Sequence, residues 1–96
     1  MEVPLQITLR DMKRSDALAA RIRFDADRLE RLHPEITSCR VVVEEAARHR
    51  LQGREFAVHV EVRLPGRDAL VSTMQRNDDV YVAVRDAFDS VRRQFD

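Results

Sequence analysis

The segment from residue 56 to residue 64 alternates apolar and polar side chains, and this pattern constrains the fold more than any other part of the chain. Its apolar positions are Phe56, Val58, Val60, Val62 and Leu64. A period of two gives a β-strand one apolar face. The pair Pro65-Gly66 follows and predicts a hairpin turn, because proline fixes one φ angle and glycine tolerates a positive one. The segment from Ala69 to Gln75 is then expected to pair back as the next strand.

Four further segments complete the predicted order of elements. Alternation from Val3 to Leu9 indicates a first strand, and the β-branched run from Ile36 to Glu45 indicates a second. Ser15 is the predicted N-cap of a helix that runs until Pro34. A second helix is expected after the capping residues 77–79. Its apolar face comprises Val80, Val84, Ala87, Phe88, Val91 and Phe95.

The order β-α-β-β-β-α predicts an α+β fold, a two-layer sandwich. The last three strands follow one another through short connections, which favours an antiparallel meander. Each helix has one apolar stripe, so we expect both helices on one face of a four-stranded sheet. The stripe of the first helix contains Leu18, Ile22, Ala26, Leu29 and Leu32 or His33. A chain of 96 residues suits a single domain over residues 1–96.

Composition and charge exclude several classes of protein. One cysteine cannot form an internal disulfide, and no apolar stretch approaches the roughly 18 residues of a membrane span, so we expect a cytoplasmic protein without a membrane partner. The 17 cations balance 17 acidic residues, so nucleic-acid binding would depend on uneven charge placement. Sixteen of these cations are arginines, a bias that suits phosphate recognition and that a GC-rich genome would also produce.

Four short segments carry a resemblance to a known family. In chain order they are ITLRDMKRSDAL at 7–18, RLER at 28–31, ITS at 36–38 and DVYVAV at 79–84. Together they resemble the ribosome hibernation-promoting factor and ribosome-associated inhibitor family, long labelled sigma-54 modulation proteins. The resemblance covers nearly the whole chain and implies a fold similar to that of double-stranded RNA-binding domains.

The resemblance also implies a function. Family members bind the small ribosomal subunit in the channel for messenger and transfer RNA, contact ribosomal RNA through basic residues, and silence ribosomes in starved cells. Some members carry an additional carboxy-terminal domain that is absent from this chain. The chain is therefore expected to be either a short form or an amino-terminal domain.

The outer face of the first predicted helix is the leading candidate for RNA contact. Opposite the apolar stripe, an arc of about 80° contains Arg21, Phe24, Arg28 and Arg31. Arginines neutralise phosphates, and an aromatic ring stacks on an unpaired base. The alternative interpretation is a solvated helix face, because Asp25, Asp27 and Glu30 interleave with the cations.

Three other groups of basic residues are further candidates. They are Arg85, Arg92 and Arg93 on the second helix, Arg48, His49, Arg50 and Arg54 in the connection before the third strand, and Arg10, Lys13 and Arg14 at the turn into the first helix. The connection has the densest positive charge, although loops are often polar merely because they are solvated. In the second helix, Ser90 stands where the family usually has a lysine, which lowers the expected number of phosphate contacts.

The histidines, the cysteine and the acidic residues do not predict catalysis. His33, His49 and His59 fall on a helix end, a loop and a strand, without the spacing of zinc ligands. Cys39 is expected on the buried side of its strand as an inert thiol. We therefore expect no enzyme activity, no metal, no cofactor and no small-molecule substrate.

A protein-interaction module is the competing function. In that case another chain would dock on Phe24 or on the exposed sheet face. The expected members of that face are Gln6, Thr8, Arg40, Val42, Glu44, His59, Glu61 and Arg63. The balanced net charge favours this alternative slightly, because a neutral protein interface needs no excess of cations.

Overall fold

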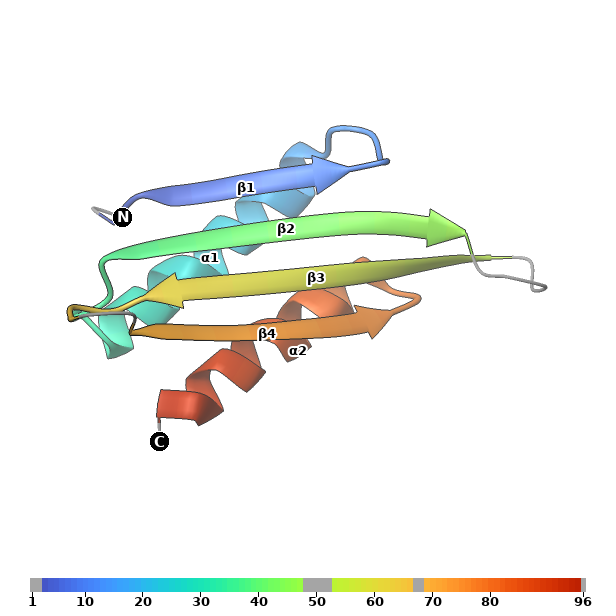
Figure 1. Cartoon of the computed structure of the whole chain (residues 1–96). Helices are drawn as coiled ribbons and strands as arrows, with labels where there is room; N and C mark the ends of the chain where they lie inside the picture. The colour runs from blue at the N-terminus through green and yellow to red at the C-terminus, as the bar shows by residue number, and fades with distance from the viewer. Residues whose placement is uncertain (1–2, 48–52, 67–68, 96) are drawn as a thin grey trace.

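The computed structural model describes residues 3–47, 53–66 and 69–95, and it confirms the predicted α+β order of elements (Figure 1). The elements are β1 (Leu5–Arg10), α1 (Asp16–Leu32), β2 (Ser38–Ala47), β3 (Arg54–Arg63), β4 (Leu70–Asn77) and α2 (Val80–Phe95). The four strands form one sheet in the order β1-β2-β3-β4.

Strands β2, β3 and β4 form the predicted antiparallel meander, and β1 pairs with β2 in parallel. It follows that β1, β2 and β4 run in the same direction and finish at the same end of the sheet (Figure 1). Because α1 follows β1 and α2 follows β4, both helices begin there. We call this the helix-start end.

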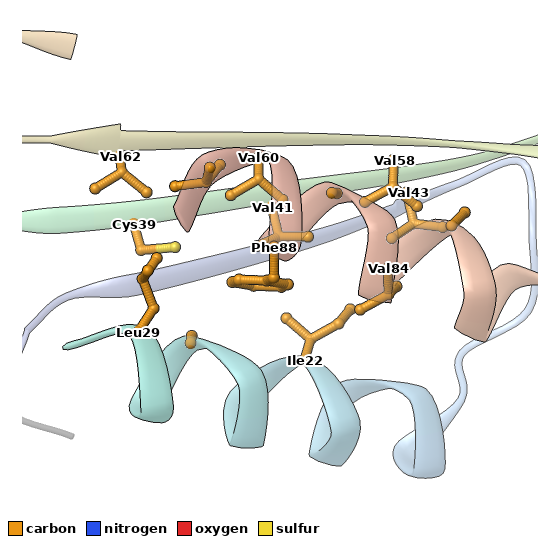
Figure 2. Packing of buried hydrophobic residues seen from close by; sticks show 14 of the residues in the cluster. Ile22, Leu29, Cys39, Val41, Val43, Val58, Val60, Val62, Val84 and Phe88 are labelled. Carbon is orange, nitrogen blue, oxygen red and sulfur yellow. The ribbon is translucent and has the colours of Figure 1, made fainter. Parts of the chain in front are cut away.

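The core lies between the sheet and the two helices, as Figure 2 shows. Alternate residues of β2 and β3 point towards the helices, and Val41, Val43, Val58, Val60 and Val62 have no exposed surface. The helices contribute the stripes predicted from the sequence, with Ile22 and Val84 also fully buried. Burying each such side chain stabilises the fold by about 1.5–3 kcal/mol. We call the face of the sheet under the helices the helix side, and the opposite face the open face.

Local hydrogen bonds fix the start of each helix as the sequence predicts. The Ser15 side chain accepts from the backbone N–H of Leu18 over 3.2 Å. At α2, the Asp79 carboxylate accepts from the backbone N–H of Tyr81 over 2.9 Å. These oxygens satisfy donors that have no partner within the helix. At the predicted hairpin turn, Gly66 has a φ of 109°, which glycine adopts without a steric penalty.

The predicted boundaries of the strands differ from the observed ones by one or two residues. The clearest difference is Ile36, which was predicted to open the second strand but lies in the turn before β2. Its side chain is 4% exposed, and its backbone N–H donates to the carbonyl oxygen of His33 over 3.1 Å. Ile36 therefore fills the core from a turn.

The structure selects one of two predicted alternatives in the first helix, and the exposure of Val42 departs from expectation. Leu32 is 59% exposed, and His33 takes the inner position of the predicted pair by stacking on Phe95 with 4.1 Å between ring centroids. Val42 lies on the open face, as predicted, but only 9% of its surface is exposed. Its neighbours across the strands are Thr8 and His59, whose side chains flank it.

Burial of Cys39 predicts a loss of stability at high pH. The residue is 4% exposed, and burial raises the pKa of its thiol from 9.0 to about 12. Below pH 9.0 the thiol is neutral in both states, whereas above it only the unfolded chain ionises. The free energy of unfolding should therefore fall by about 1.4 kcal/mol per pH unit from pH 9.0 towards 12.

Urea denaturation across this pH range would measure the effect of the thiol. Cys39→Ala should lack this component of the slope, because groups that titrate elsewhere in the chain are the same in both proteins. An identical slope in the wild type and the variant would contradict the assignment to Cys39.

Candidate nucleic-acid interface

The outer face of α1 carries an aromatic ring next to a cation. Phe24 is 57% exposed, and the guanidinium carbon of Arg28 lies 5.8 Å from the centre of its ring. Within the described part of the chain, Arg28 forms no ion pair with a carboxylate. The pair therefore offers a free guanidinium and an accessible ring on one rigid helix.

The two other predicted arginines of α1 are paired with acidic residues. The Nε atom of Arg21 lies 3.1 Å from a carboxylate oxygen of Asp25, and Arg31 pairs with Asp27. Each pair spans one helical turn, so the acidic residues that interleave with the cations also neutralise them in part. The pair of Arg31 and Asp27 is exposed and contributes little to stability, so exchanging its carboxylate for a phosphate costs little free energy. The Asp25 side chain is only 11% exposed, so Arg21 is held in a partly buried pair.

The fold brings one arginine from each helix to a common groove. This inter-helix groove is lined by Asp25, Arg28, Leu29 and Leu32 from α1 and by Phe88, Asp89 and Arg92 from α2. Its apolar floor carries arginines on both sides. The sequence patterns placed Arg28 and Arg92 on separate helix faces, whereas the structure places them along one groove.

The remaining basic residues of α2 differ in their surroundings. A guanidinium nitrogen of Arg92 lies 3.6 Å from a carboxylate oxygen of Asp89, and a guanidinium nitrogen of Arg85 lies 3.3 Å from a carboxylate oxygen of Asp86. Arg93 is exposed, without an ion pair among the described residues. Ser90, which stands in place of a lysine, shares a hydrogen bond of 2.9 Å with Thr73 of β4. Ser90 therefore helps to fix α2 on the sheet and offers no charge.

A second basic site lies at the helix-start end. It is a hollow lined by Lys13, Arg14, Glu45, Arg54, Phe56, Tyr81 and their neighbours, and we call it the helix-start hollow. It joins two of the predicted groups, the turn before α1 and the start of β3. The other predicted members of that connection, Arg48, His49 and Arg50, lie outside the described residues. Tyr81 was not among the predicted site residues. The sequence signal that could have identified it is its position outside the apolar stripe of its helix, where an aromatic side chain is exposed.

Arg10 is separated from the other basic residues of its predicted group. It lies on the open face, where it lines a shallow hollow with Arg40, Val42, Glu44, Ala57, His59 and Met74. Lys13 and Arg14 instead line the helix-start hollow. The chain turns between them at Asp11, whose φ is 56°.

Residues 3–47, 53–66 and 69–95 contain no group of three or more His, Cys, Asp or Glu side chains placed to hold a metal ion. Neither helix has the length and apolar character needed to span a membrane.

Comparisons with known proteins agree with this fold. The family model described as Sigma 54 modulation protein / S30EA ribosomal protein matches residues 5–96. A ribosomal subunit interface protein from Coxiella burnetii has a TM-score of 0.78 and 21% sequence identity, covering 96% of this chain and 92% of that one. The N-terminal domain of Protein Y from Thermus thermophilus has a TM-score of 0.69 and 22% identity, covering 98% and 94% respectively. No match was found among curated protein sequences.

Proposed function

The chain belongs to the Sigma 54 modulation protein / S30EA ribosomal protein family, and from this membership we propose that it binds the small ribosomal subunit and lowers translation. The family is one of ribosome-associated proteins and not of enzymes. In this proposal the chain contacts ribosomal RNA in the channel for messenger and transfer RNA. It acts in the cytoplasm as a single domain over residues 1–96, without catalysis or a cofactor.

The observation that carries the RNA contact is the inter-helix groove. Arg28 has no carboxylate partner among the described residues, and Arg92 stands on the other helix of the same groove. The exposed ring of Phe24, beside Arg28, lies outside the groove and lines a neighbouring hollow. Phosphates accept hydrogen bonds from guanidinium groups, and unpaired bases stack on aromatic rings. A polynucleotide strand offers both groups at regular intervals, so one strand would engage both helices.

Binding to small ribosomal subunits should depend steeply on salt. Each phosphate contact contributes about 0.7–0.9 to the slope of log affinity against log salt concentration. Contacts from Arg28, Arg92 and one further cation would give a slope of roughly −2 or steeper. Co-sedimentation with purified small subunits across a salt titration measures this slope.

A cell-free translation reaction tests the second half of the proposal. The domain should reduce protein synthesis at a several-fold excess over ribosomes. A flat salt dependence would contradict RNA contact, and undiminished synthesis despite demonstrated binding would contradict inhibition.

One observation favours the alternative of a protein-interaction module. Met74 is 52% exposed on the open face, beside His59 and the mostly covered Val42. An apolar side chain in a shallow hollow suits a protein partner more than a phosphate. The alternative predicts weak salt dependence and loss of binding when the open face, rather than the helix side, is changed.

A further inference from the structure

The helix-start hollow lies towards the opposite end of the helix side from Arg28 and Arg92, which lie in the second halves of their helices. We propose that this hollow binds an unpaired nucleotide of single-stranded RNA. The base stacks on Tyr81, and the neighbouring phosphates contact Lys13, Arg14 and Arg54. This inference rests on the proposed function for the class of its ligand and adds a second contact site to it.

Tyr81 presents its ring from a fixed position. The residue is 40% exposed on the first turn of α2, and its backbone N–H donates to Asp79 over 2.9 Å. Tyr81 is outside the buried core, whereas Met12, Phe56 and Val80 pack against the core and form the apolar part of the hollow. A flat ring beside an apolar surface matches the faces of a base, which stack irrespective of base identity.

The cations around Tyr81 are available to phosphates. Lys13 is exposed and forms no ion pair among the described residues. Arg14 pairs with Asp16 over 3.1 Å, but both side chains are almost fully exposed, with relative areas of 89% and 87%. Such a pair contributes little, so a phosphate can replace its carboxylate.

The hollow offers exposed cations and not a net positive charge. Arg54 pairs with the less exposed Glu45 over 3.2 Å, and Asp11 is the second carboxylate of the lining. Asp16, which pairs with Arg14 outside the lining, balances the third cation, so phosphates would bind by replacing exposed carboxylate partners. The cations come from the turn before α1 and from β3, and the ring comes from α2. The site therefore exists only in the folded chain (Figure 1).

Tyr81 itself provides the readout, because the chain contains one tyrosine and no tryptophan. Its emission should be quenched saturably by a short single-stranded oligoadenylate, after correction for absorption by the RNA. A double-stranded RNA of the same length and free AMP form the two comparison arms. At concentrations where the single strand quenches Tyr81 emission to saturation, neither of these should do so. The bases of the duplex are not free to stack on the ring, and AMP has a single phosphate.

Variants separate stacking from charge and from folding. Tyr81→Leu retains an apolar side chain but no tyrosine, so its binding is followed with a labelled oligonucleotide. It should weaken oligoadenylate binding by roughly 5- to 160-fold, the loss expected for one stacked base. Tyr81→Phe, followed by competition with a labelled oligonucleotide, should bind within about twofold of the wild type, because the ring remains. Lys13→Glu should lower the salt slope by about 1. Met74→Leu, on the open face, serves as the matched control and should bind like the wild type.

The outcomes distinguish this inference from the proposed function. If the wild type binds small subunits but Tyr81→Leu binds both the subunits and the oligonucleotide equally well, the inference is wrong and the proposed function stands. If AMP quenches Tyr81 as tightly as the oligonucleotide, the site takes a free nucleotide and the assignment to RNA is wrong. Failure of the wild type to bind subunits at any salt concentration would contradict the proposed function itself.

Discussion

Replacing Arg28 and Arg92 together by glutamate should weaken binding to small ribosomal subunits by about 100-fold or more while the fold is retained. Both side chains line the inter-helix groove. A hydrogen bond to a charged group is worth about 1.5–3 kcal/mol, so two lost contacts correspond to at least that factor. Repulsion between the new carboxylates and the phosphates weakens binding further. The salt slope should decrease by about 1.4–1.8, the contribution of two phosphate contacts.

A double variant on the open face is the matched control for charge. Arg40→Glu with Arg76→Glu changes the net charge by the same amount at two exposed positions away from the helices. It should bind subunits close to wild-type affinity, and circular dichroism should show both double variants folded. If the open-face variant loses binding while the groove variant keeps it, the protein-interaction alternative replaces the RNA contact proposed for the groove.

Phe88→Ala should lower the free energy of unfolding by about 3–5 kcal/mol, the usual cost of removing a buried aromatic ring. The Phe88 ring is 7% exposed and points from α2 into the space between the sheet and α1 (Figure 2). Because domains of this kind are stable by only about 5–15 kcal/mol, the variant should lose a large fraction of its stability.

The same substitution at an exposed ring is the control for the core. Phe24 is 57% exposed and contacts Arg28 on its own helix, so Phe24→Ala should cost less than about 1 kcal/mol. Urea denaturation of both variants beside the wild type measures the difference. Equal losses at the two positions would show that the Phe88 ring does not hold the two layers together.

Much of this architecture was predictable because the apolar pattern within each strand or helix indicates which of its faces is buried. The alternation around Val60 and the stripe through Ile22 are local patterns, and the structure confirms both. The helix caps were predictable for the same reason, since Ser15 and Asp79 act within one turn. The parallel position of β1 beside β2 was not predicted, because it depends on the path of α1 across the sheet and not on a local pattern.

The candidate sites were less predictable than the fold. Single-helix patterns identified Arg28 and Arg92 separately, but their common groove depends on how α1 and α2 lie beside each other. The patterns also grouped Arg10 with Lys13, whereas the turn at Asp11 sends these side chains to different surfaces. Tyr81 was missed because its significance depends on cations from distant parts of the chain.

The parallel placement of β1 sets the order in which the chain can assemble. The β3–β4 hairpin closes within a few residues, with the N–H of Leu64 bonded to the carbonyl of Ala69, and it can form early. β1 instead pairs with β2 across the whole length of α1, with Leu5 opposite Cys39. Closing that long loop costs more entropy and is rewarded only once β2 is in place. Of the four strands, β1 is therefore expected to join the sheet last.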